Sequence, residues 1–98
     1  MESFVNILSL NVGLSSTLAG LSSIASVNNI HLVLLQEVRI NKEQLNNLVG
    51  GFGFEAEVNI DLETPSKPGT AIAWRISLPI QEVVSITSCR CQVALIGT

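Results

Sequence analysis

Charged residues are scarce in this chain, and their scarcity limits the classes of protein to which it can belong. Only 13% of the 98 residues are Asp, Glu, Lys or Arg, whereas an ordinary soluble domain has about 25%. The hydrophobic share is 47% and the mean hydropathy is +0.48, which excludes an intrinsically disordered chain. So little charge is typical of a protein whose surfaces are covered by further polypeptide. We therefore expect residues 1–98 to be the N-terminal portion of one domain, truncated on its C-terminal side.

Basic residues and long hydrophobic runs are missing from the N-terminal third. The first basic residue is Arg39, and Glu2 stands where a signal peptide would carry positive charge. Ser, Asn and Gly interrupt every apolar run before it reaches the roughly 18 residues of a transmembrane helix. We expect an intracellular protein, nuclear or cytoplasmic, with no membrane partner. With a net charge of -3, the chain also lacks the excess of basic residues that is expected of a nucleic-acid-binding protein.

Tyrosine is absent, and cysteine and histidine are rare. Cys89 and Cys91 form a C-x-C pair, which the period of a strand places on one face. Two cysteines make a poor zinc site because zinc normally takes four ligands. We expect two reduced thiols in a core-facing strand.

The most informative feature that is present is the run of residues 30–38. Leu32 and Leu34 fall on one face of a predicted strand, and Val33 and Leu35 fall on the other. Two apolar faces indicate a central strand with cover on both sides. Glu37 follows at its carboxyl end, where a carboxylate must be solvated, paired or bound to a cation. Glu37 is therefore either the polar end of a strand or a metal ligand.

The remaining pattern predicts a mixed α/β protein. Strands are expected over residues 4–10, 30–38, 54–60, 70–74, 80–86 and 90–96. Ser15 or Ser16 begins a first helix with Leu18, Leu21 and Ile24 at helical spacing. Asn41 and Gln44 form a capping box for a short helix that ends at Gly50-Gly51. The first strand, helix and second strand predict a parallel pair, and the later strands look antiparallel.

Four motifs together resemble the endonuclease/exonuclease/phosphatase superfamily, and most closely the abasic-endonuclease-like domain of non-LTR retrotransposons. They are Ser9-Leu10-Asn11-Val12-Gly13-Leu14, Leu34-Leu35-Gln36-Glu37, Gly53-Phe54 and Gly69-Thr70-Ala71-Ile72-Ala73-Trp74. The resemblance runs from about Val5 to the end of the chain. It implies the N-terminal part of a four-layer α/β sandwich, in which two mixed β-sheets are flanked by helices.

The resemblance also implies a site and an activity. Glu37 matches the carboxylate that binds Mg²⁺, for which Mn²⁺ can substitute, and Asn11 matches the active-site Asn that orients this carboxylate and the phosphate. Mg²⁺ prefers oxygen ligands and usually retains several waters. The implied function is phosphodiester hydrolysis on DNA, carried out by the full domain.

The family's later motifs are missing from these residues. Its Tyr, its Asp-x-Asn pair and its terminal Ser-Asp-His have no counterpart, and the turn after Asn11 is one residue shorter than in related domains. His31 lies at the opposite end of the predicted strand from Glu37, roughly 20 Å away at about 3.3 Å per residue. Asp61 falls in a loop and matches no catalytic Asp. We expect the 98-residue chain to be inactive alone.

Three functions are compatible with these residues. The first is the Mg²⁺-dependent endonuclease, which needs the missing C-terminal half of the fold. The second is a non-catalytic remnant or interaction fragment of the same fold, for which self-association through uncovered strands is expected. The third is a nucleotide-binding module built on Asn11-Val12-Gly13-Leu14, although one glycine does not make a G-x-G-x-x-G motif.

Overall fold

The computed structural model describes residues 4–12, 20–21, 23, 29–51, 53–60, 67–86 and 91–97. Within them lie six strands and a helix of nine residues. The elements are β1 (Ile7–Asn11), β2 (Leu32–Val38), α3 (Lys42–Gly50), β3 (Phe54–Asn59), β4 (Gly69–Arg75), β5 (Ile80–Ile86) and β6 (Cys91–Ile96).

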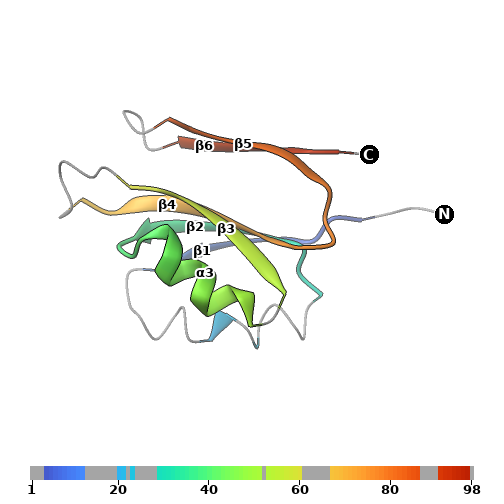
Figure 1. Ribbon diagram of the computed structural model, residues 1–98, viewed down its shortest axis with the longest axis horizontal. Helices are drawn as coiled ribbons and strands as arrows, with labels where there is room; N and C mark the ends of the chain where they lie inside the picture. Colours follow the sequence, from blue (N-terminus) through green and yellow to red (C-terminus); the bar gives the residue numbers. More distant parts are fainter. Residues whose placement is uncertain are drawn as a thin grey trace.

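A four-stranded mixed sheet occupies the middle of the molecule, with strand order β1-β2-β4-β3. β1 and β2 are parallel, as the sequence predicts, and β4 is antiparallel to both β2 and β3. A second sheet contains the antiparallel pair β5 and β6. Figure 1 shows three layers, with α3 below the four-stranded sheet and the β5–β6 ribbon above it. No helix among the described residues is long and apolar enough to span a membrane.

The two faces of the four-stranded sheet have different neighbours. Side chains at alternate strand positions pack with α3 into the main core, where Val33, Leu35 and Ala73 are almost completely buried. The opposite face, which we call the inner face, is directed toward β5 and β6. Inner-face side chains form rows across the sheet, such as Leu34 beside Ile72. The period of two within each strand therefore divides the apolar residues between two interfaces.

The helix α3 begins and ends where the sequence indicates. The backbone N–H of Gln44 donates to the side chain of Asn41, and the Gln44 side chain accepts from the Asn41 backbone, which completes the capping box. Leu45 and Val49 face the core, whereas Leu48 is 51% exposed. The helix α3 thus contacts the core through a narrow stripe of apolar side chains.

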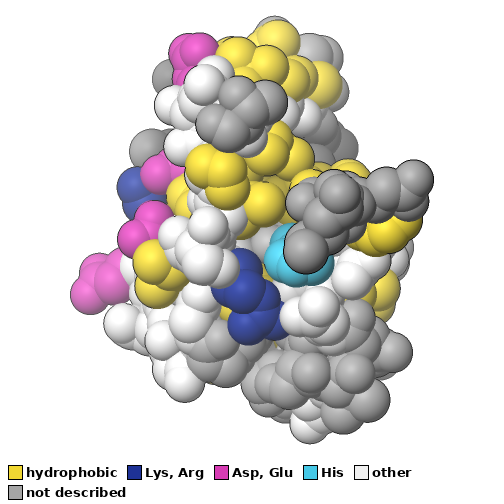
Figure 2. All heavy atoms as spheres, turned by 90° about the vertical axis from the view of Figure 1, so that its right-hand side faces the viewer, with side chains coloured by type: hydrophobic (Ala, Val, Ile, Leu, Met, Phe, Trp, Pro, Cys, Tyr) yellow, Lys and Arg dark blue, Asp and Glu magenta, His cyan; other side chains and the backbone are white. Residues whose placement is uncertain are grey.

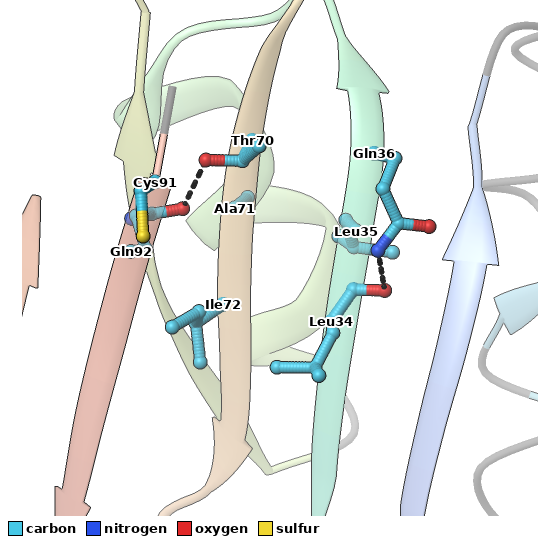
Figure 3. A pocket seen from close by; sticks show the side chains of 8 residues that line it. All are labelled: Leu34, Leu35, Gln36, Thr70, Ala71, Ile72, Cys91 and Gln92. Atoms are coloured by element: carbon cyan, nitrogen blue, oxygen red, sulfur yellow. Dashed lines mark hydrogen bonds between the residues drawn. The ribbon is translucent and has the colours of Figure 1, made fainter. Parts of the chain in front are cut away.

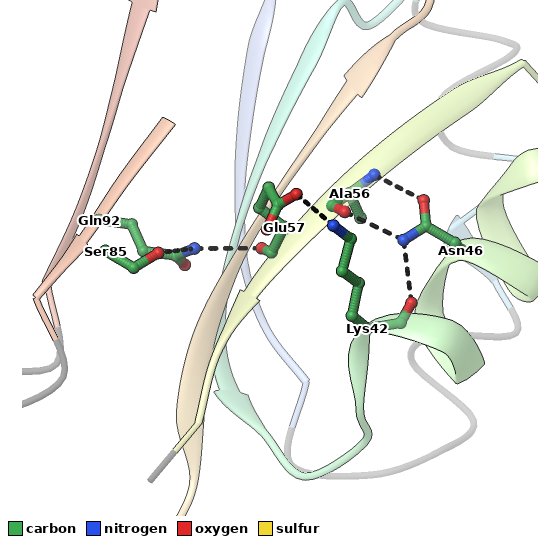
Figure 4. A network of polar contacts seen from close by, with 6 residues as sticks. All are labelled: Lys42, Asn46, Ala56, Glu57, Ser85 and Gln92. Atoms are coloured by element: carbon green, nitrogen blue, oxygen red, sulfur yellow. Dashed lines mark hydrogen bonds and ion pairs between the residues drawn. The ribbon is translucent and has the colours of Figure 1, made fainter. Parts of the chain in front are cut away.

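A side chain of α3 also protects the outer edge of the sheet. The Asn46 amide donates to the carbonyl oxygen of Ala56 and accepts from its N–H, at 3.0 and 2.9 Å. These two bonds, drawn in Figure 4, occupy backbone groups on the edge strand β3. Lys42 and Glu57 form an ion pair beside them. Asn46 therefore takes the place of a neighbouring strand at this edge.

The β5–β6 ribbon has apolar side chains on both faces. Val83 and Ala94 are half-buried against the four-stranded sheet, while the cross-strand pair Val84 and Val93 is exposed on the outside. Figure 2 shows hydrophobic side chains at the surface of the upper part of the molecule, where Figure 1 places the ribbon. An antiparallel ribbon with one solvated face normally carries polar residues there. The apolar outer face therefore fits a layer of further polypeptide over it.

Two expectations from the sequence need correction, and two others fall largely outside the described residues. β1 begins at Ile7 and not at Phe4, which is 72% exposed outside the sheet. Cys91 is exposed and not core-facing, because the side chains that alternate with it on β6 are those that face the other sheet. Leu21 and Ser23 are helical, but most of the predicted first helix lies outside the described residues, as does Cys89.

Candidate functional site

The candidate site lies at the carboxyl ends of the parallel strands β1 and β2. Asn11 is the last residue of β1 and lies beside Gln36, the residue that precedes Glu37. The N–H of Val12 donates to the carbonyl oxygen of Gln36 at 2.8 Å and extends the pairing by one step. Asn11 and Glu37 are therefore held at the same end of the sheet, where ligands of open α/β sheets bind. Both residues are exposed.

Glu37 is the extra residue of a β-bulge. Gln36 pairs with Thr70 and Val38 pairs with Gly69, so that two steps on β2 match one step on β4. The regular alternation of a strand would send the residue after Gln36 into the core, but Val38 occupies that position and is 1% exposed. The bulge thus turns the carboxylate of Glu37 out to solvent, which is a common use of bulges beside active sites.

The backbone of Glu37 is left-handed, with a φ of 56°. Among the described residues, positive φ also occurs at Gly53 and Asn29, and these are the residue types that adopt it at low cost. A glutamate in this region costs about 1–2 kcal/mol, and such strain is concentrated at functional sites. This local feature is invisible in the sequence, where Glu37 reads as the regular end of a strand.

The strand registers place a row of polar side chains across the inner face beside Glu37. Asn11, Gln36, Thr70 and Asn59 are successive partners from β1 to β2, β4 and β3. Gln36 also exchanges hydrogen bonds with Ser9, at 3.2 and 3.4 Å between side-chain atoms. We call Asn11, Gln36, Thr70 and Asn59 the polar row. Sequence reasoning found only Asn11, because the others are separated along the chain and align only once the registers are known.

Side chains of β6 and the polar row connect the two sheets. The Thr70 hydroxyl donates to the Gln92 Oε1 at 2.8 Å, as Figure 3 shows. The Gln92 amide donates to the Glu57 carbonyl oxygen and to Ser85, drawn in Figure 4. Each sheet is thereby held in register with the other at the end that carries Glu37.

Asn59 on β3 also joins the two sheets at this end, through a buried side chain. It is 4% exposed, and its amide Nδ2 donates to the carbonyl oxygens of Ile86 and Cys91 at 3.3 and 3.2 Å. These carbonyls belong to the end of β5 and the start of β6, so one buried side chain fixes the base of the ribbon. Gly69 has to be glycine beside it, because a Cβ there would overlap the carbonyl oxygen of Asn59. Close packing against Asn59 therefore explains why the Gly69–Trp74 motif begins with glycine.

The other residues considered in the sequence, apart from Arg39, lie away from this end or outside the described residues. His31 precedes β2 at its opposite end, where its Nδ1 accepts from the N–H of Asn6 at 3.0 Å. Trp74 is half-buried next to Leu32 at the same far end. Arg39 is exposed just beyond β2. The residues outside the described part are Gly13, Leu14, Asp61 and Glu63.

The donor set fits a weakly held oxygen-seeking cation and no more. Within the described part of the chain, no three side chains of the His, Cys, Asp and Glu types come together. The carboxylate of Glu37 and the amide oxygen of Asn11 are the oxygen donors from the two strand ends. Mg²⁺ fits one or two protein oxygens because it retains most of its waters, whereas Zn²⁺ needs three or four firm ligands.

Comparisons with known proteins support the fold. No protein-family model matches the chain, and no curated protein matches it. Among solved structures, it is similar to a crystal structure of humanized D. rerio TDP2 with 14 mutations, with a TM-score of 0.65 and 21% identity. The match covers 95% of this chain and 42% of the TDP2 chain. The chain thus has part of the endonuclease/exonuclease/phosphatase fold, which confirms the fold that the sequence motifs imply.

Proposed function

We propose that this chain supplies the metal-binding end of a Mg²⁺-dependent phosphodiester hydrolase that acts on DNA, of the kind found in retrotransposon endonucleases. The observation that carries the proposal is the left-handed bulge at Glu37. Glycine would occupy this backbone conformation at a lower cost. A glutamate at the carboxyl end of an inner strand, next to the strand end with Asn11, supports a role for its carboxylate.

The two side chains have separate tasks in this proposal. Glu37 holds the cation through a carboxylate oxygen, and Mn²⁺ can replace Mg²⁺ there. Asn11 orients that carboxylate and a phosphate oxygen through its amide, without adding charge. The cation, when bound, polarises a phosphoryl oxygen and stabilises the leaving oxyanion. The Ser9–Gln36 hydrogen bonds hold the ends of β1 and β2 together and so limit the movement of Asn11 relative to Glu37.

A second candidate is a non-catalytic interaction fragment of the same fold. It is favoured by the exposed outer face of the ribbon, where Val93 and Leu95 are 45% and 47% exposed. It is also favoured by the lack, among the described residues, of any group of three His, Cys, Asp or Glu side chains that could hold a metal ion. A group that activates water is worth about 10²–10⁴-fold in rate. The isolated chain is therefore expected to show no hydrolysis above background, and any active form needs residues beyond these.

Metal binding by the isolated chain is the direct test. Mn²⁺ is titrated into ¹⁵N-labelled protein, and the paramagnetic broadening of each amide signal is measured. Broadening should be greatest around residues 36–38 and at Asn11, and Glu37→Gln should remove it because the amide keeps the volume but loses the charge. Glu55→Gln is the matched control, since Glu55 is an exposed glutamate on β3 near the other end of the sheet. Broadening that survives Glu37→Gln would contradict the assignment.

Nicking of a supercoiled plasmid tests the activity itself. The 98-residue chain should not nick in Mg²⁺, whereas a longer protein that carries the rest of the domain should nick and should lose this activity in the Glu37→Gln variant. Unimpaired nicking by that variant, or robust nicking by the 98 residues alone, would show that the active site is elsewhere. A longer protein that binds Mn²⁺ through Glu37 but does not nick would favour the interaction fragment.

A further inference from the structure

The first residue of β4, Gly69, lies between the bulge at Glu37 and the end of β3. Within the four-stranded sheet, β4 has β2 on one side and β3 on the other. On the β2 side, Gly69 is the partner of Val38, the residue that follows Glu37. On the β3 side, a Cβ at Gly69 would overlap the carbonyl oxygen of Asn59 and lie 2.9 Å from its carbonyl carbon. Gly69 therefore sets how closely the start of β4 approaches β3, directly opposite the bulge.

A side chain at position 69 would act on the bulge. The atoms that its Cβ would meet belong to the backbone of residues 59 and 60, so no flexible side chain can move aside. The overlap is relieved when the start of β4 moves away from β3, and this direction leads toward β2. Glu37 on β2 already has a φ of 56°, in a left-handed region that is narrow for residues with a Cβ. A small shift of β4 should therefore change the backbone that directs the Glu37 carboxylate.

The end of β3 is in turn held by the β5–β6 ribbon. The buried amide of Asn59 donates to the carbonyl oxygens of the last residue of β5 and the first residue of β6. Beside it, the Thr70 hydroxyl donates to Gln92 of β6, and Figure 3 shows Thr70 on β4 with Gln92 on one side and Gln36 of β2 on the other. The base of the ribbon thus fixes Asn59, the backbone of Asn59 limits the position of Gly69, and Gly69 faces the bulge.

We propose that Gly69 and Asn59 are positioning residues for Glu37. They hold the bulge in the conformation that directs the carboxylate to the cation, so that the base of the ribbon sets the affinity of the metal site. This inference rests on the proposed function in one respect, namely that the Glu37 carboxylate takes a cation. Residues that orient a metal ligand without touching the metal typically change the metal affinity by about 10–100-fold. The effect should therefore appear in metal binding by this chain, without any hydrolysis.

The test compares Gly69→Ala with Val49→Ala in the isotope-labelled 98-residue chain. Val49 is 1% exposed on α3, so its truncation weakens the core on the side of the sheet away from the ribbon. Two quantities are measured. The first is the one-bond Cα–Hα coupling of Glu37 without metal, which distinguishes positive from negative φ. The second is the Mn²⁺ dissociation constant, obtained from the broadening around residues 36–38.

A positioning role and a merely structural role predict different results. Gly69→Ala should change the coupling of Glu37 and weaken Mn²⁺ binding by about tenfold or more. Val49→Ala should change neither quantity, although it also lowers the stability of the fold. Asn59→Ala is the milder second variant, and it decides the matter if Gly69→Ala does not fold. Because it removes the bonds to the ribbon but adds no atom, it should weaken Mn²⁺ binding by a smaller factor than Gly69→Ala.

The proposal is overturned if the folded variants at positions 59 and 69 keep the native coupling and the native Mn²⁺ affinity. It is also overturned if Val49→Ala changes these two quantities as much as they do. A native chain that does not bind Mn²⁺ through Glu37 would instead overturn the proposed function. In that case the coupling of Glu37 in Gly69→Ala, measured without metal, would still decide whether Gly69 holds the bulge.

Discussion

Replacing Asn59 by alanine should separate the two sheets more effectively than any other single polar change considered in this chain. The side chain is 4% exposed and donates to two backbone carbonyls, those of Ile86 and Cys91. Each of the two hydrogen bonds contributes about 0.5–1.5 kcal/mol net. We expect Asn59→Ala to lower the free energy of unfolding by about 1–3 kcal/mol, against a usual total of about 5–15 kcal/mol.

Urea denaturation measures this loss through the fluorescence of Trp74, the only tryptophan, which is half-buried on the inner face. With a slope of about 1–2 kcal/mol per molar urea, the midpoint should fall by about 0.5–3 M. Asn47→Ala, on the exposed side of α3, is the control and should change the stability by less than about 0.5 kcal/mol. A midpoint for Asn59→Ala within the range of this control would refute the role assigned to the buried amide.

Asn59→Asp adds a test of hydrogen-bond direction. A carboxylate cannot donate to two carbonyl oxygens, whereas the protonated acid can donate to one of them. Burial next to these oxygens should raise the pKa of the introduced acid above its unfolded value of about 3.9. The free energy of unfolding of the variant should therefore be closest to that of the native protein below a pH of about 3.9. It should fall relative to the native protein as the pH rises through the folded pKa. A stability difference that does not change with pH would contradict this account.

Three further predictions address packing, charge and association. Gly69→Ala should cost about 1–3 kcal/mol in urea denaturation because its Cβ meets a backbone carbonyl, whereas Gly50→Ala, whose Cβ meets nothing, should be neutral or stabilising. Lys42→Ala should cost less than about 1 kcal/mol despite the 2.6 Å ion pair with Glu57, since the lysine side chain is 60% exposed. The isolated chain should self-associate through the outer face of the ribbon in light scattering, and Val93→Thr should reduce this association; a clean monomer at high concentration would contradict it.

Much of the fold could be predicted from the sequence because its signals are local. β5 has the predicted bounds, and the capping box at Asn41 fixes the start of α3. The parallel pairing of β1 and β2 follows from the strand-helix-strand order. The exposure of individual side chains was harder to predict. Leu48 and Cys91 are apolar residues in a helix and a strand, but whether each side chain is buried depends on which elements pack beside it. The low share of charged residues indicated that some surface is covered by further polypeptide, but it did not show which face of the fold that surface is.

The site could be predicted only as far as one-dimensional spacing allows. Glu37 stands out because it follows an apolar strand, whereas Asn11 is proposed only because its motif resembles that of the superfamily. The polar row and the clamp from Gln92 depend on strand register between segments up to 34 positions apart (Gln36 to Thr70), and no local pattern encodes such a register. The bulge was missed for the same reason, since it is a mismatch between β2 and β4.

The bulge gives the sharpest test of whether Glu37 is retained for its chemistry. Glycine at this position relieves the left-handed strain, worth about 1–2 kcal/mol, and loses about 0.5–1 kcal/mol through the greater freedom of the unfolded chain. In metal-free urea denaturation, Glu37→Gly should therefore stabilise the chain by up to about 1.5 kcal/mol, while Glu37→Gln should leave its stability unchanged because the strain remains. Both should abolish the Mn²⁺ broadening. Stabilisation together with lost metal binding would mean that the chain keeps a costly residue where a cheaper one folds better, as expected of a functional carboxylate. If Glu37→Gly destabilises the chain, the glutamate is held there by packing, and the bulge no longer supports a metal site.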